Sequence, residues 1–122
     1  MPSSYSSNVG IELPANGEQA GTWGNVVNSN MAIIDRLTSG VGYNYLTGTT
    51  GTISIANAIL SNGHYPVIIF NGAPSGENTV SITPSTVQRV FIFKNTTSEN
   101  VVISQGTGAG GTVTLVPGES KI

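Results

Sequence analysis

The sequence predicts a mainly β protein, in which an N-terminal extended arm and one short α-helix precede a small antiparallel β-sandwich or barrel-like domain. Runs of β-branched and aromatic residues, such as 67–70 and 90–93, are separated by Asn-Gly and Pro-containing turn signals. Charged residues make up only 8% of the chain and hydrophobic residues 38%. Gly, Ser, Thr and Asn supply most of the polarity, which suits an extended all-β protein or a protein kept in an assembly.

We expect two regions along the chain. Residues 1–40 form an extended arm plus a helix, and residues 41–122 form the β-rich domain. Residues 1–21 carry prolines, glycines and serines without a sustained period, apart from a short strand within 9–13. Such an arm needs a neighbouring surface to lie on.

Residues 22–38 are the one good helix candidate, with Thr22 as N-cap and Gly40 to end it. Its apolar residues recur at spacings of three and four, which gives one apolar face: Trp23, Val26, Val27, Met31, Ile34 and Leu37. One heptad frame makes a coiled-coil seam whose polar member, Asn30, would set the oligomer number: Trp23, Val26, Asn30, Ile33 and Leu37. The alternative is a single amphipathic helix lying on its own sheet.

The remaining chain is expected to contain six strands, at residues 52–55, 64–71, 79–82, 87–94, 101–104 and 112–116. In 87–94 the centre of both faces is apolar, which predicts a strand covered on both sides. No internal repeat is evident. Because Lys121 and Ile122 look like the opening of another strand, we expect the β region to continue beyond residue 122 in the full protein.

Several classes of function are disfavoured by composition. A net charge of −2 gives no electrostatic attraction to nucleic acid, and no apolar run is long enough for membrane insertion. The chain has no cysteine for a thiolate or disulfide site. The N-terminus lacks the pattern of a secretory signal, so we expect synthesis in a cytoplasm.

No catalytic, cofactor-binding or metal site is expected. The carboxylates are scattered, no G-x-S-x-G occurs, and the Gly-rich run 106–111 lacks the Lys-Ser/Thr of a phosphate loop. His64 is the only histidine, so it could bind a metal only if three copies met on a fibre axis. Tyr43, Tyr45 and Tyr65 are candidates for a sugar-stacking surface, or for ordinary strand tyrosines with buried rings.

Residues 17–35, which read GEQAGTWGNVVNSNMAIID, carry the most specific signal. They resemble the segment near the start of tail-fibre and related virion structural proteins of tailed bacteriophages, marine and cyanobacterial ones in particular. Residues 89–103 resemble the family's pattern of strand, Asn-containing turn and strand. The matching positions of the first segment are Gly17, Glu18, Gly21, Thr22, Trp23, Gly24, Asn28, Asn30, Ile34 and Asp35.

The resemblance implies a non-enzymatic virion component in the tail. It would be a trimer whose N-terminal region docks on adaptor- or nozzle-type tail proteins, while distal parts meet a host receptor. The candidate docking or oligomer interface is Gly21, Thr22, Trp23, Gly24, Asn28, Asn30, Ile34 and Asp35. Trp23 could wedge against a neighbour or fill the domain's own core. The alternatives are a capsid or tail decoration protein, and a carbohydrate-binding β-sandwich module.

The resemblance thus implies a homotrimer in the virion tail, made in the host cytoplasm and attached through residues 1–40. These partners and this location are expectations that come from the resemblance alone.

Overall fold

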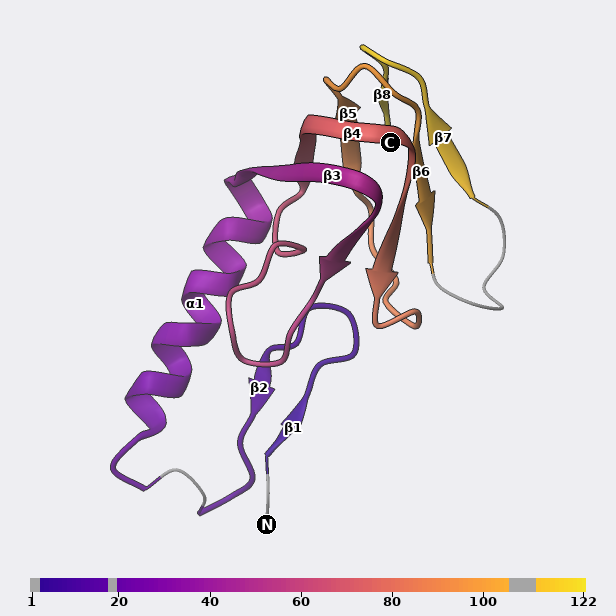
Figure 1. Cartoon of the computed structure of the whole chain (residues 1–122). Coiled ribbons are helices and arrows are strands. Elements are labelled where there is room, and N and C mark those ends of the chain that lie inside the picture. The colour runs from indigo at the N-terminus through magenta and orange to yellow at the C-terminus, as the bar shows by residue number, and fades with distance from the viewer. Residues whose placement is uncertain (1–2, 18–19, 106–111) are drawn as a thin grey trace.

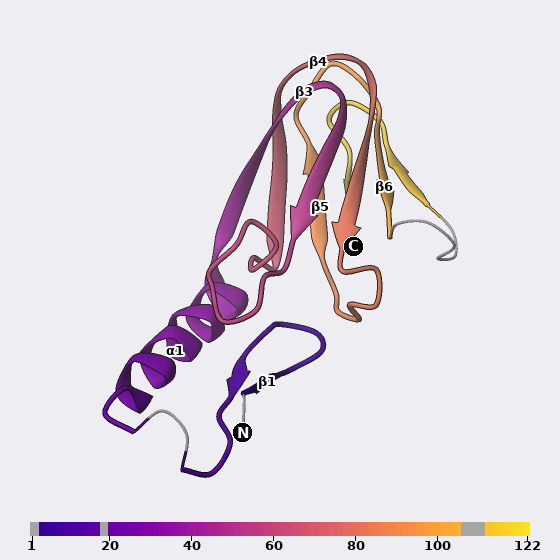
Figure 2. The same cartoon turned by 60° about the horizontal axis from the view of Figure 1, so that its bottom comes forward.

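The chain is described by a computed structural model that covers residues 3–17, 20–105 and 112–122. Its main feature is a six-stranded sheet that is bent into a V and closes toward a barrel (Figures 1 and 2). The strands of this sheet are β3 (Val41–Ser54), β4 (Val67–Thr83), β5 (Ile92–Asn95), β6 (Val101–Ser104), β7 (Val113–Leu115) and β8 (Ser120–Lys121). The mainly β class with an arm, one helix and a barrel-like sheet is therefore confirmed.

The sheet is built from V-shaped layers, each with a first leg, a bend and a second leg. β3 and β4 are single strands that contain the bend, whereas β5 and β6 form the two legs of the third layer. On the first legs, Val41 pairs with Val67 and Val67 with Ile92. β7 and β8 form a fourth layer that runs in the opposite direction.

The direction of the main strand pairs differs from the expectation. The pairs β3–β4, β4–β5 and β4–β6 are parallel. Antiparallel pairing, which the sequence predicted throughout, is found in β5–β8 and β6–β7 and in the small sheet of the arm. The physical reason is that a long connecting segment, such as 55–66, carries the chain back to the end where the previous strand began. The next strand therefore runs in the same direction.

The expected strand boundaries are corrected in the same way. β3 begins at Val41, well before the predicted start at residue 52, and the predicted strands 64–71 and 79–82 belong to the one bent strand β4. Asn71 and Gly72 lie at this bend, where Gly72 has a φ of 107° that favours glycine. Signals that were interpreted as turns between strands therefore mark bends within a strand. The layers also form a structural repeat that the sequence does not make evident.

The core lies between the two legs. Inward-pointing residues of successive layers stack on one another, as in the row of Gly42, Ile68 and Phe93. The rings of Phe70 and Phe93 are stacked with centroids 5.6 Å apart. The buried members of this core are Leu46, Ile53, Ile55, Ile68, Phe70, Val80, Ile82, Val87, Phe91, Phe93, Val101, Ile103 and Leu115.

The second leg of β3 has its outer edge covered by one side chain. Asn62 Nδ2 donates to the Thr52 carbonyl oxygen at 2.9 Å, and the Ser54 backbone N–H donates to Asn62 Oδ1 at 2.6 Å. The side-chain amide thus occupies the donor and acceptor that a further strand would use.

The helix α1 (Trp23–Ser39) precedes β3 and lies beside the arm and the 55–66 segment (Figure 1). The arm contains the two-stranded sheet of β1 (Ser4–Tyr5) and β2 (Glu12–Leu13). The helix begins after Thr22 as expected, but the Thr22 side chain makes no cap hydrogen bond; its carbonyl oxygen accepts the Asn25 N–H at 3.0 Å. Within the described residues, no helix has the length and apolar character needed to cross a membrane.

Candidate functional site

The arm is held to the helix by Asn30. Its Nδ2 donates to the Glu12 carbonyl oxygen and its Oδ1 accepts the Glu12 N–H, each at 3.0 Å. On the same face of the helix, Val26 and Ile33 are buried. The middle of the predicted seam, at Val26, Asn30 and Ile33, is therefore occupied within the chain, which contradicts the coiled-coil interpretation, while Trp23 at its start is exposed. The alternative, a single amphipathic helix lying on its own sheet, is right that the helix packs within the chain, but the arm and not the six-stranded sheet provides the contact with Asn30.

His64 fastens the arm to the β domain. Its side chain is fully buried, with Nε2 2.8 Å from the Val9 carbonyl oxygen, while the Ser61 backbone N–H donates to Nδ1 at 3.0 Å. Because a carbonyl only accepts, Nε2 carries the proton, and because Nδ1 accepts the Ser61 N–H it carries none, so the imidazole is neutral. Burial lowers the pKa of His64; the hydrogen bond to Val9 opposes this, and the positive charges of Arg89 and Arg36 lower the pKa further. With both nitrogens used, His64 does not fit the idea of an ion bound on a fibre axis.

Two further contacts fix the path of the arm. The Ala58 N–H donates to the Gly10 carbonyl oxygen at 2.6 Å, and the Gln88 N–H donates to Asn8 Oδ1 at 2.9 Å. Gly10 has a φ of 68°, and a Cβ atom there would lie 2.5 Å from the Ala56 carbonyl oxygen. Only glycine fits this crossing.

Two arginines organise the region around Tyr65. The Arg36 guanidinium lies 4.6 Å from the centroid of the Tyr65 ring, and it donates to the Ser61 carbonyl oxygen at 3.4 Å. Arg89 donates to the carbonyl oxygens of Gly63 and Tyr65. Arg36 is thus used within the chain, so it is not a free partner for the neighbouring Asp35. Tyr65 is partly buried against the core, which removes it from the candidate sugar-stacking surface.

The predicted docking residues lie mainly on the outside of the helix and at its start. Trp23 is 64% exposed, so it does not fill the core of this domain. Asn30 is the exception, because its amide is bound to the arm. The exposed members of the predicted set are Gly21, Thr22, Trp23, Gly24, Asn28, Ile34 and Asp35.

Four exposed apolar side chains form a continuous line on α1, which we call the helix stripe: Trp23, Val27, Met31 and Ile34. Their spacings of four, four and three place them on one face of the helix. The apolar face of α1 is therefore wider than the part that the arm covers. The helix stripe contains Trp23 and Ile34 of the predicted set, and it adds Val27 and Met31.

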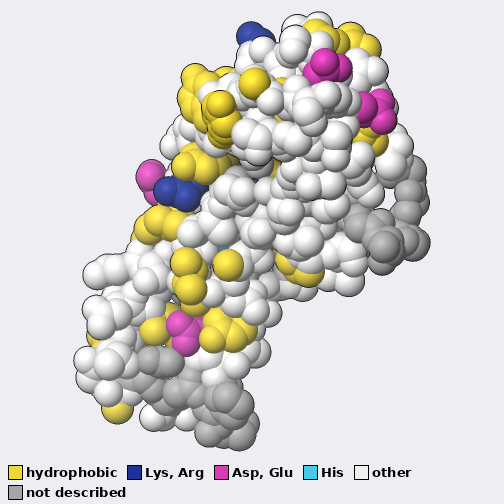
Figure 3. Space-filling view, in the orientation of Figure 1, with side chains coloured by type: hydrophobic (Ala, Val, Ile, Leu, Met, Phe, Trp, Pro, Cys, Tyr) yellow, Lys and Arg dark blue, Asp and Glu magenta, His cyan; other side chains and the backbone are white. Residues whose placement is uncertain are grey.

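The outer side of the first legs is a second exposed surface that is mainly apolar, of which the sequence analysis singled out only Tyr43 and Tyr45. We call it the first-leg face; its exposed residues are Val41, Tyr43, Tyr45, Ile92 and Lys94, with Ile69 half-buried between them. Figure 3 shows hydrophobic side chains gathered on the upper left of the molecule, beside the start of β3. The alternation of Val41, Tyr43 and Tyr45 in the sequence was a usable signal for this surface.

The outer side of the second legs is different in character. It presents hydroxyl groups in register, with Thr50 paired to Thr79 and Thr52 to Ser81. Residues on this side alternate with the buried Ile53, Val80 and Ile82. One side of the V is thus apolar and the other polar, although both are built from β-favouring residues.

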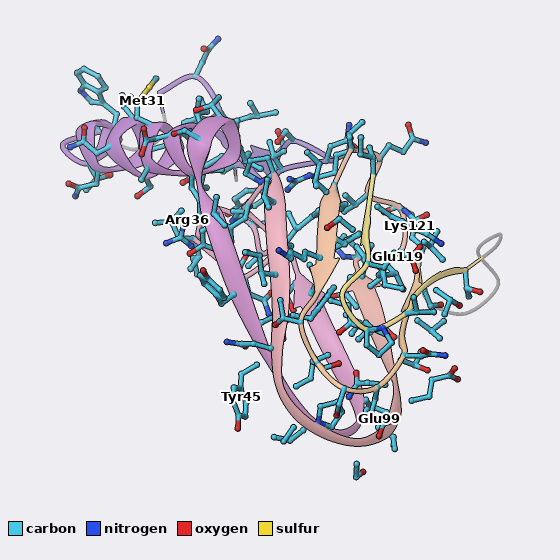
Figure 4. All side chains as sticks on the ribbon, turned by 90° about the horizontal axis from the view of Figure 1, so that it is seen from above. Met31, Arg36, Tyr45, Glu99, Glu119 and Lys121 are labelled. Carbon is cyan, nitrogen blue, oxygen red and sulfur yellow. The ribbon has the colours of Figure 1, made fainter. Side chains whose placement is uncertain are left out.

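Three of the glutamates lie at bends. Glu77 lies in the bend of β4, Glu99 between β5 and β6, and Glu119 between β7 and β8; Figure 4 shows Glu99 and Glu119. Glu119 makes an ion pair with Lys121 at 2.9 Å. Among the residues that the structure covers, no three acidic, His or Cys side chains are grouped so that they could hold a metal ion. The Gly-rich run 106–111, expected to be a hairpin loop, lies outside the described residues.

Comparison of the chain with protein-family models, with curated proteins and with solved structures gave no match.

Replacing Asn30 by alanine is expected to loosen the arm, because both hydrogen bonds to the Glu12 backbone are lost. Hydrogen exchange at the amides of residues 8–13 should become faster by about tenfold or more, since two lost hydrogen bonds weaken local stability by roughly 1–3 kcal/mol. Asn28→Ala, on the exposed side of the same helix, is the matched control. Equal exchange in both variants would show that Asn30 does not hold the arm.

The stability of the protein is expected to fall as the pH is lowered below 6.5, the ordinary pKa of histidine. Because burial lowers the pKa of His64 in the folded protein, the unfolded chain takes up a proton there before the folded chain does. The contribution of His64 to the free energy of unfolding is therefore fully present above pH 6.5. It decreases as the pH falls, until the pH reaches the pKa of His64 in the folded protein. Urea unfolding at several pH values measures this loss. His64→Gln should be less stable throughout but lack the drop in this window, and a drop of equal size in that variant would contradict the assignment.

Proposed function

We propose that this chain is a structural virion protein, the N-terminal, tail-attachment portion of a trimeric bacteriophage tail fibre that contributes to host adsorption. The proposal starts from the resemblance of residues 17–35 to the family described above. The observation that supports it most is the exposure of Trp23 within that segment. A large aromatic ring held outward on an ordered helix is typical of a docking surface.

The arrangement of the arm supports an anchoring role. Asn30 and His64 hold the arm against the helix and the β domain through residues that are far apart in the sequence. The surface around Trp23 is consequently formed before any partner binds, so docking costs little ordering entropy. The proposed partners are adaptor- or nozzle-type tail proteins, with the host receptor met by distal parts of the fibre.

The placement of the ionisable groups supports a non-enzymatic role. Glu77, Glu99 and Glu119 lie at separate bends, and the imidazole of His64 is enclosed and hydrogen-bonded at both nitrogens. General acid–base catalysis needs such groups to converge on an accessible cleft. The chain thus fits a protein that acts through its surfaces.

Immunogold electron microscopy of virions from a phage that encodes this chain tests the proposal. Label at the tail is expected. Trp23→Ala should reduce the copies per virion by about tenfold or more, because loss of a buried aromatic anchor weakens docking strongly. Val90→Ala, also exposed and apolar but distant in sequence, is the control. Label on the head would favour a decoration protein, and absence of the chain from virions would exclude both.

A carbohydrate-binding module is the second candidate, and Tyr43 and Tyr45 favour it. They are 67% and 68% exposed and point outward from alternate positions of β3, as a platform for stacking sugar rings requires.

Alanine at Tyr43 and Tyr45 should then weaken binding of host surface polysaccharide by about tenfold, as expected for the loss of aromatic stacking. Isothermal titration measures the binding. Tyr65→Phe is the control, because that ring is partly buried beneath Arg36. Unchanged binding after the two alanine substitutions would remove this candidate.

A further inference from the structure

The first-leg face carries more apolar surface than a solvent-exposed sheet needs. Residues 67–70 of β4 and residues 92–93 of the neighbouring β5 are apolar on both faces, which is the pattern of strands that are covered on both sides. The inner face lies in the core, but on the outer face Val41, Tyr43 and Tyr45 are exposed in the described chain. A second layer that covers the outer face would complete the pattern.

The helix stripe is an exposed apolar surface of the same chain that could cover the first-leg face of a neighbouring copy. Covering the helix stripe with the first-leg face of a neighbour would bury on the order of 1,000 Å² in total, about the area that a specific protein contact requires. Figure 4 shows Met31 pointing away from α1 and Tyr45 pointing away from β3 in a different direction. One chain therefore cannot bring its own two surfaces together.

Charge separates the possible ways of joining two copies. Asp35 is exposed beside Ile34 of the helix stripe, and Lys94 is exposed on the first-leg face next to Ile69. Neither side chain makes an ion pair within the part of the chain that the structure describes. A contact of stripe with stripe offers Asp35 no lysine, and a contact of face with face offers Lys94 no carboxylate, because each surface as defined carries charge of one sign. A contact of stripe with face brings opposite charges together.

We infer that the partner of the first-leg face is a second copy of this chain, whose helix stripe lies across it with Asp35 near Lys94. This contact is heterologous, because it joins two different surfaces. Each chain then has two neighbours, and repeated contacts close into a ring when the rotation allows it. The inferred contact would be the interface of the proposed trimer. Only the number of chains in the assembly, three, rests on the proposed function.

Mixing two variants of the full 122-residue chain tests the interface. Met31→Glu spoils the helix stripe and Tyr45→Glu spoils the first-leg face, while each variant keeps the other surface intact. Light scattering over a concentration series should show the wild type associated, and each variant weakened by about tenfold or more. An equimolar mixture of the two should form a 1:1 pair, since one complete interface remains between them.

Thr79→Glu, on the polar outer side of the second legs, is the matched control and should associate like the wild type. Circular dichroism confirms that each variant folds. Asp35→Lys and Lys94→Glu should each weaken association, and the double variant should restore it.

A wild type that stays monomeric at millimolar concentration, or a mixture that stays monomeric while the wild type associates, would overturn the inferred interface. A trimer without complementation would leave the proposed fibre standing and refute this interface. Complementation with an assembly of another size would support the interface and contradict the trimer.

Discussion

A strand that is hydrogen-bonded to a bent neighbour has to bend at the same level, and this constraint sets the shape of the whole β domain. In the third layer the bend lies between β5 and β6, and Asn95 holds it. This fully buried residue donates from Nδ2 to the carbonyl oxygens of Glu99 and Leu115. Its Oδ1 accepts the Thr97 N–H at 2.9 Å. An apolar side chain there would leave several backbone groups without partners in the interior. The bend in turn fixes which side chains of each leg point inward and which point outward.

The sequence was sufficient for the fold class, for the single helix and for strand β6, because each depends on local pattern. The direction of the strands was not predictable in this way. Asn71 and Gly72 are a typical hairpin signal, yet here they lie at a bend inside one strand whose parallel partner arrives after a long connection. Whether such a signal reverses the chain or only bends it depends on the neighbouring layer, which local sequence does not specify.

The candidate site was predictable to a similar extent. Trp23 and Ile34 were recognised, because a helical period and a family resemblance both identified them. Asn30 was expected to serve an oligomer seam, but whether an amide binds the chain's own arm or a neighbour's depends on tertiary packing. Tyr43 and Tyr45 were grouped with Tyr65 as a candidate sugar-stacking surface, and only the register of β3 with β4 shows that they share a surface with Ile69 instead. Surfaces assembled from several layers become visible only after the layers are aligned.

The side-chain amide of Asn62 has a consequence for how this protein can aggregate. Sheets with an unprotected edge recruit further strands, and the products of such recruitment are fibrils whose backbone bonding makes them nearly irreversible. With Asn62 bonded to Thr52 and Ser54, the second leg of β3 cannot serve as a template for this growth. At this edge, association between folded molecules is left to side-chain surfaces, where contacts can form, dissociate and be corrected during assembly.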